Sequence, residues 1–284
     1  MPRVAATVPL HETQKYQEGR VFTSFANIVY ERRGSAAWIS LNRPDQLNAL
    51  SLGLLRELDE AVNRARNDDD VRALVLTGRG RAFCAGADLK EIQEAQATST
   101  PGDPDILDLI KPVFGALRSL PKPTIAAVNG LALAGGLELV MTCDIVFAAE
   151  SARMGDAHSN FGVFPGAGGA AILPGRIGLH RAKYLLFTGE HVSAREMLEM
   201  GLVSRVVEDD ALASVVEAFV EALAEKSPAV LRRMKAVANR SLHQSEQAAL
   251  TDELLNLRDH MRSYDMQEGL AAFREKRKPV FRGY

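Results

Sequence analysis

The sequence predicts an α/β fold in which a largely parallel sheet is followed by a layer of helices. Three short apolar runs rich in branched residues, at 71–77, 124–128 and 145–148, are typical of buried strands. Segments with helical spacing separate such runs, and parallel strands need crossover connections of this kind. After about residue 176, strand-like runs become scarce and helical spacing dominates.

The first expected elements are a hairpin and an amphipathic helix. Residues 27–31 and 36–41 are strand-like, and the segment 32–35 between them has the Gly and Ser of a hairpin turn. Apolar residues then recur at helical spacing from 54 to 65, and Ser51 precedes them as a candidate N-cap. We therefore expect the ordered fold to begin after a leader and to enter its first helix directly after Ser51.

The last third contains several signals of helix starts. Ser193 and Glu196 have the spacing of a capping box, and Ser227 precedes a proline that suits the first helical turn. Helices are expected at 182–187, after Ser193, at 212–224, after Ser227, between about 244 and 262, and at 266–277.

Length and composition are those of an ordinary globular protein. The chain has 284 residues, of which 46% are hydrophobic and 25% charged, and this excludes a disordered or collagen-like chain. We expect three parts: a mobile N-terminal leader at 1–23, a core at 24–210 and a C-terminal helical region at 211–284. With 34 basic and 36 acidic side chains the net charge is −2, so there is no overall attraction to nucleic acid or an anionic membrane.

Membrane insertion, secretion and a disulfide framework are not expected. No stretch approaches the roughly 20 apolar residues that cross a bilayer, and the leader lacks the apolar core of a secretion signal. Cys84 and Cys143 are the only cysteines, and neither has zinc-binding spacing. A reducing, cytoplasmic location is the expectation.

Two glycine-rich loops, at 78–88 and 129–138, stand where strands are expected to end, and ligands bind at such places in parallel sheets. Glycine allows a close approach of the backbone, and the first amides of a following helix are free to bind negative charge. The loops lack the motifs of nucleotide-phosphate sites and of a nucleophilic serine. The alternative is that these glycines serve only tight turns.

Glu138 and His158 are the candidate acid–base residues. Glu138 begins an apolar segment and is expected to point inward, where a carboxylate suits proton transfer; the alternative is a carboxylate that caps its own helix. His158 lies in a loop before another glycine-rich helix start, and the alternative is a structural histidine. The histidines at 11, 180, 191, 243 and 260 have no ligand spacing, so no metal is expected.

Together these motifs resemble the enoyl-CoA hydratase/isomerase family, the crotonases, over about residues 25–284. The matching motifs are NRP at 42–44, NAL at 48–50, RAFCAGADLK at 81–90, KP at 122–123, GGLE at 135–138, CD at 143–144 and FPGAGG at 164–169. The resemblance implies a spiral of ββα units with a C-terminal helical trimerisation region, and trimers or hexamers. It also implies an acyl-coenzyme A thioester as substrate, with no separate cofactor, and a role in fatty-acid β-oxidation.

The resemblance also assigns roles to residues. The amides of Ala87 and Gly135 are expected to form an oxyanion hole for the thioester carbonyl. Lys90 is expected near the coenzyme phosphates. The residues expected along the coenzyme are Ala87, Asp88, Leu89, Lys90, Gln46 and Leu47.

One catalytic position departs from the hydratase pattern. Glu138 matches the glutamate that acts on water, but His158 occupies the position of the second glutamate, which protonates the α carbon. We expect a 2-enoyl-CoA hydratase in which His158 is the proton donor. The alternatives are another acyl-CoA reaction of this family (carbon–carbon hydrolysis, decarboxylation or isomerisation) and a non-catalytic RNA-binding role, for which the only dense basic run is 274–278.

Overall fold

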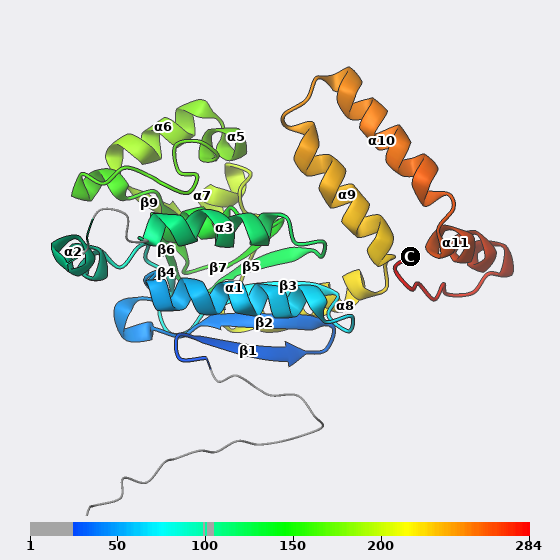
Figure 1. Cartoon of the computed structure of the whole chain (residues 1–284), viewed down its shortest axis with the longest axis horizontal. Helices are drawn as coiled ribbons and strands as arrows, with labels where there is room; N and C mark the ends of the chain where they lie inside the picture. Colours follow the sequence, from blue (N-terminus) through cyan, green and yellow to red (C-terminus); the bar gives the residue numbers. More distant parts are fainter. Residues whose placement is uncertain (1–24, 99, 101–104) are drawn as a thin grey trace, which may run out of the picture.

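The computed structural model describes residues 25–98, 100 and 105–284, so the expected leader at 1–23 lies outside the described residues. A six-stranded sheet forms the centre of the core, in the order β1-β2-β3-β5-β7-β10 (Figure 1). Its strands are β1 (Ile28–Arg33), β2 (Ala36–Leu41), β3 (Ala73–Gly78), β5 (Thr124–Val128), β7 (Ile145–Ala149) and β10 (Arg205–Val207). Only β1 and β2 pair antiparallel in this sheet, which confirms both the predicted hairpin and the largely parallel sheet.

The apolar patterns of the sequence did not predict the strands of a second, four-stranded sheet. It consists of β4 (Ala82–Cys84), β6 (Leu131–Leu133), β8 (Arg153–Gly155) and β9 (His191–Ser193). Strands β4, β6 and β8 each follow a strand of the large sheet after a few residues, so the chain repeatedly passes from one sheet to the other. This is the predicted spiral of ββα units. Strands of three residues are too short to show alternation in the sequence.

The helices over the core begin with α1 (Leu52–Asn67), where Ser51 Oγ accepts a hydrogen bond from the Leu54 amide at 3.1 Å, as the N-cap prediction required. Helix α3 (Ile106–Arg118) packs against α1 but has no counterpart among the predicted elements, because Pro112 and Gly115 lower its helical propensity. The remaining helices of the core are α2 (Leu89–Thr98), α4 (Gly135–Val140), α5 (Leu173–Ile177), α6 (Leu179–Thr188) and α7 (Ala194–Glu199), with the short 3-10 turns η1 (Pro44–Gln46), η2 (His158–Phe161) and η3 (Asp209–Ala211).

The C-terminal helices divide into one that covers the sheet and three that stand away from it. Helix α8 (Leu212–Ala224) packs on the large sheet, with the Phe219 ring centroid 5.1 Å from that of Phe147. Helices α9 (Pro228–Ser241), α10 (Glu246–His260) and α11 (Tyr264–Glu275) project from the core (Figure 1). The division of the chain at residue 210 stays a prediction, and α8 contributes to the core layer.

Ion pairs and hydrogen bonds attach the projecting helices. Lys235 of α9 lies 2.7 Å from Asp144, which follows α4. The Asp265 carboxylate accepts hydrogen bonds from the Arg282 and Gly283 amides and so holds the C-terminal segment against α11. No helix within the described ranges is both long enough and apolar enough to pass through a bilayer.

Candidate active site

The two predicted glycine loops meet where β4 and β6 end. Gly135 is the first residue of α4, and a Cβ on it would lie 3.4 Å from the Gly86 Cα and 3.5 Å from the Ala87 amide nitrogen. Ala134, just before the helix, has a φ of 49° and a ψ of −120°, an unfavourable conformation for a residue with a side chain. The strained backbone of Ala134 therefore lies where the start of α4 packs against the Ala87 loop.

The amides of Ala87 and Gly135 are both available to a ligand. Within the described residues neither donates a hydrogen bond to a protein acceptor. For Gly135 this follows from its position, because the first amide of a helix has no intrahelical acceptor. Two neighbouring free N–H donors can bind a developing oxyanion without rearranging.

The close packing of α4 requires glycine at a second position. A Cβ on Gly136 would lie 1.9 Å from the carbonyl oxygen of Cys84 in β4, which leaves no room for any side chain. The two loops are therefore more than tight turns, because their glycines allow one helix start and one strand to touch.

Glu138 lies in the first turn of α4 and is 2% exposed. Its Oε1 accepts hydrogen bonds from the Ala167 amide at 2.9 Å and the Gly169 amide at 2.8 Å. The inward orientation is confirmed. These donors come from the FPGAGG segment, so the alternative of a carboxylate satisfied by its own helix is wrong.

Arg118, which sequence reasoning missed, supports the same segment. Its Nη2 donates to the Ala167 carbonyl at 2.9 Å from the C-terminal end of α3. Burial lowers the pKa of Arg118, Arg176 lowers it further, and the charge of Glu138 raises it. Arg118 belongs to no sequence motif and lies at the end of a helix that was not predicted, so no signal in the sequence pointed to it.

His158 is the first residue of η2, and its side chain is 10% exposed. Its Nδ1 lies 2.9 Å from Oδ1 of Asp156, which is itself 1% exposed. Burial lowers the pKa of His158, but the hydrogen bond and charge of Asp156, with the charge of Glu138, raise it by more, so the pKa is raised above the ordinary histidine value. Sequence reasoning missed Asp156, although its spacing of two residues from the histidine was visible.

The segments predicted to bind coenzyme A are held together by an Arg–Asp pair. Arg43 Nη2 lies 2.9 Å from Oδ2 of Asp88, and both side chains are largely buried. The Ala85 amide donates to the Leu47 carbonyl at 3.0 Å, which places Gln46 and Leu47 beside the Ala87 loop. Burial raises the pKa of Asp88, but its hydrogen bonds to Arg43 and to the start of α2 leave it below its usual value. The Asp88 carboxylate is therefore already engaged, and its contact with coenzyme stays a prediction.

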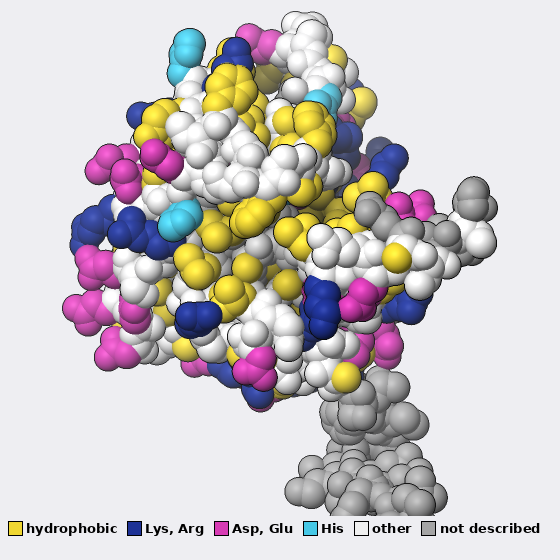
Figure 2. All heavy atoms as spheres, turned by 90° about the vertical axis from the view of Figure 1, so that its left-hand side faces the viewer, with side chains coloured by type: hydrophobic (Ala, Val, Ile, Leu, Met, Phe, Trp, Pro, Cys, Tyr) yellow, Lys and Arg dark blue, Asp and Glu magenta, His cyan; other side chains and the backbone are white. Residues whose placement is uncertain are grey.

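Lys90 and Leu89, by contrast, project outward. The Lys90 side chain is 85% exposed and its Nζ is 3.9 Å from Glu94. Exposed apolar side chains gather on the same face, and Figure 2 shows a hollow there with hydrophobic side chains on its floor. The exposed large hydrophobic residues of α2, α3 and the η2 region are Leu89, Leu107, Phe161, Val163 and Phe164.

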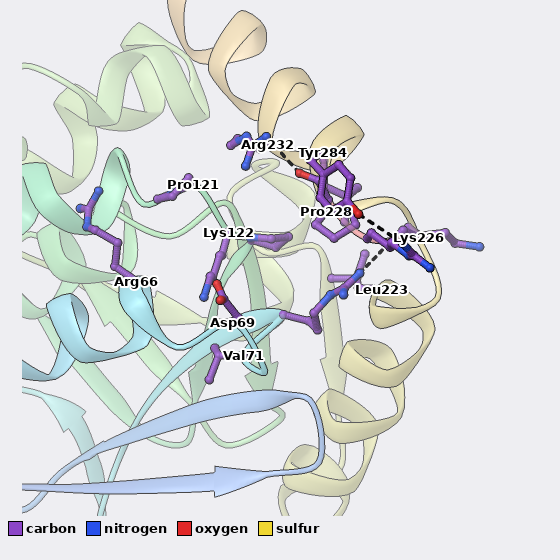
Figure 3. A pocket seen from close by; sticks show the side chains of 15 residues that line it. Arg66, Asp69, Val71, Pro121, Lys122, Leu223, Lys226, Pro228, Arg232 and Tyr284 are labelled. Atoms are coloured by element: carbon purple, nitrogen blue, oxygen red, sulfur yellow. Dashed lines mark hydrogen bonds between the residues drawn. The ribbon is translucent and has the colours of Figure 1, made fainter. Parts of the chain in front are cut away.

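A separate cavity of about 480 Å³ lies between the core and the C-terminal helices (Figure 3). Its basic side chains donate to backbone carbonyls: Lys122 Nζ to Asp68 at 2.6 Å and Arg232 Nη2 to Gly283 at 3.3 Å. Neither Glu138 nor His158 lines this cavity, so it is distinct from the candidate active site.

The family model described as enoyl-CoA hydratase/isomerase matches residues 31–284. The chain belongs to the enoyl-CoA hydratase/isomerase family. Within this family it is 36% identical to a short-chain-enoyl-CoA hydratase of Clostridium acetobutylicum over 253 residues, which cover 89% of this chain and 96% of that protein. It is 35% identical to a crotonyl-CoA hydratase of Syntrophomonas wolfei over 259 residues, covering 91% and 98% of the two chains.

Solved structures of similar fold belong to the same family. A crystal structure of enoyl-CoA hydratase from Bacillus anthracis superimposes with a TM-score of 0.85 at 37% identity and covers 91% of this chain and 100% of that one. This confirms the predicted crotonase-type fold of the family.

Proposed function

We propose that this family member is an enoyl-CoA hydratase that adds water across the 2,3 double bond of a 2-enoyl-CoA thioester. The observation that carries the proposal is the position of Glu138, a buried carboxylate fixed by two amides and next to the free N–H pair of Ala87 and Gly135. The relatives named as hydratases support the choice of reaction.

In the proposed reaction the Glu138 carboxylate takes a proton from water, whose oxygen bonds to C3 of the substrate. The electron pair of the double bond moves toward the thioester, and the amides of Ala87 and Gly135 stabilise the resulting enolate oxygen. The enolate then collapses and C2 takes a proton from the imidazolium of His158. Exchange with solvent returns one proton to His158 and removes one from Glu138, so the net reaction consumes only substrate and water.

The histidine suits this role because its hydrogen bond to Asp156 raises its pKa above the ordinary histidine value, which favours the imidazolium form that donates a proton. Gln46, Leu47, Asp88, Leu89 and Lys90 are proposed to border the coenzyme, with the exposed Lys90 ammonium near a phosphate. The apolar hollow of Figure 2 is proposed to receive the acyl chain.

Self-association into trimers or hexamers is part of the proposal. Helices α9 and α10 project from the core and enclose a largely apolar groove, with Met234, Leu250 and Leu257 among its residues. Covering such a surface with another copy removes apolar area from water. Native mass spectrometry gives the oligomeric state directly, and a monomer at micromolar concentration contradicts this part.

The proposed cellular location is the cytoplasm, and the proposed pathway step is hydration in fatty-acid β-oxidation. Both cysteines are buried free thiols, and burial raises the pKa of each to about 12, so they stay protonated in a reducing compartment. An RNA-binding role has less support, because Arg277 pairs with Glu268 and Glu275 and Lys278 pairs with Glu225.

The test is the reaction itself. Purified protein is mixed with crotonyl-CoA, and the loss of absorbance of the conjugated enoyl thioester is followed while the product is identified by mass. A gain of one water, giving the 3-hydroxyacyl thioester, supports the proposal. Binding of the thioester without turnover rejects hydration and directs the search to hydrolysis, decarboxylation or isomerisation of other acyl-CoA esters.

A further inference from the structure

The pair formed by Asp156 and His158 carries an inference that rests on the proposed function but concerns a different residue. Asp156 directly follows β8 and is 1% exposed. In the part of the chain that the structure describes, its Oδ1 forms hydrogen bonds only with the histidine two residues later, to the ring Nδ1 at 2.9 Å and to the backbone amide at 3.4 Å. Among the described residues its Oδ2 has no hydrogen-bond partner at all.

A buried carboxylate with so few partners needs a positive neighbour to remain ionised. His158 is the titratable group in contact with it, and an imidazolium meets that need. The pairing also fixes the proton on the ring, because an ionised carboxylate only accepts and Nδ1 must then be the donor. The nitrogen left to exchange protons with a substrate is Nε2.

The backbone is arranged for this contact. Ala157, between the two residues, has a φ of 57°, a left-handed conformation that residues with a side chain rarely adopt. Asp156 Oδ2 lies against Gly169, where a Cβ would come within 2.3 Å of it. The same Gly169 donates its amide to Glu138 Oε1 at 2.8 Å. Gly169 therefore contacts both Glu138, through its amide, and Asp156, the partner of His158, through the space that a Cβ would fill.

We propose that Asp156 is a positioning residue that holds His158 with Nδ1 protonated and Nε2 directed to the substrate, so that an Asp–imidazolium pair replaces the second catalytic carboxylate. Asp156 itself does not touch the substrate. The pair carries no net charge when His158 is protonated, and its charge is −1 when the histidine is neutral.

Other charged groups around η2 are placed differently. The charge of Glu138 in α4 also raises the pKa of His158, but Glu138 makes no hydrogen bond to the ring within the described residues. Helix α6, which packs against η2, carries His180, Arg181, Lys183 and Tyr184, all exposed, and the Tyr184 hydroxyl donates to Glu190. Asp156 is therefore the carboxylate whose removal isolates the effect on the ring.

The first experiment needs no substrate, and a variant serves only to assign signals. In protein with ¹⁵N-labelled histidine, the His158 signals are assigned by their loss in His158→Gln, and the ring nitrogens are followed across pH 5 to 9. The proposal expects Nδ1 to keep its proton throughout, while Nε2 loses its proton as the pH rises through the raised pKa of the ring. An Nδ1 that deprotonates, or an even mixture of tautomers, overturns it.

The second experiment uses Asp156→Asn, which preserves the shape of the side chain. We expect the pKa of His158 to fall in this variant and the alkaline limb of kcat for crotonyl-CoA to move to lower pH. The drop in kcat at pH 8 should be about tenfold or more, with the 10²–10⁴-fold that a positioned acid contributes as its upper bound. In a His158→Gln background the same change should alter kcat by less than about twofold, because the residue acts through the histidine. Asp209→Asn, which removes a surface carboxylate bonded to the Ser151 amide, is the matched control.

An equal loss of kcat in both backgrounds, or an unmoved pH profile, means that Asp156 is merely structural. If crotonyl-CoA is not hydrated by the wild-type protein, the proposed function fails but the titration of His158 still decides the pairing. The two failures are therefore separate results.

Discussion

Replacing Glu138 with glutamine separates a catalytic carboxylate from a structural one. The glutamine oxygen can still accept from the Ala167 and Gly169 amides, which now lie 2.9 and 2.8 Å from Oε1. Each bond changes from a charge-assisted one, worth about 1.5–3 kcal/mol, to a neutral one worth about 0.5–1.5 kcal/mol. The stability loss in Glu138→Gln is therefore about 2–3 kcal/mol. Glu138→Ala leaves two buried amides unpaired and costs about 2–6 kcal/mol.

The assay pairs thermal unfolding with crotonyl-CoA hydration. At about 2–4 °C per kcal/mol for a chain of this size, Glu138→Gln should lower Tm by about 4–12 °C, and Glu138→Ala by more, up to about 24 °C. Hydration should fall by about 10²–10⁴-fold in both variants because both lose the general base, while thioester binding persists in Glu138→Gln. Turnover in Glu138→Gln within a few fold of wild type would refute the role of Glu138 as general base, and Glu138 would then only hold the FPGAGG segment in place.

Three other predictions follow from the same geometry. His158→Glu places a second carboxylate against the buried Asp156, so this variant should lose both stability and hydration activity. The double variant His158→Glu with Asp156→Asn should recover stability and activity; equal activity of the single and double variants contradicts the pairing of Asp156 with His158. Hydration should fall as pH rises through the His158 pKa, which is raised above the ordinary histidine value, because the imidazolium that donates the proton is lost; a flat profile of kcat from pH 6 to 9 rejects His158 as the proton donor. Gly136→Ala should destabilise the fold by about 1–3 kcal/mol or more in thermal melts, because the new Cβ would lie 1.9 Å from the Cys84 carbonyl oxygen. The control Gly115→Ala in helix α3, whose Cβ would have nothing within 4 Å, should gain about 0.5–1 kcal/mol, and equal Tm shifts of the two variants would refute the contact.

Local patterns in the sequence determined most of the elements. Ser51 caps α1 as its position predicted, and the run 124–128 is β5 to the residue. Apolar spacing and cap chemistry are local properties, and they survive into the fold because the interactions join residues three or four positions apart. The motif residues Glu138 and His158 were likewise identified from the sequence, through their place in glycine-rich segments.

Only the tertiary structure decided how these residues are held. The donors to Glu138 lie 29 and 31 residues further along the chain, and Arg118 supports them from a helix that the sequence did not reveal. The three-residue strands of the second sheet bring the two glycine loops together, and strands so short have no pattern of their own. Contacts between distant segments depend on how the layers pack, and a single sequence contains no local record of that packing. For the same reason the sequence suggested His158 only as a candidate proton donor, while the fold showed which buried carboxylate it faces.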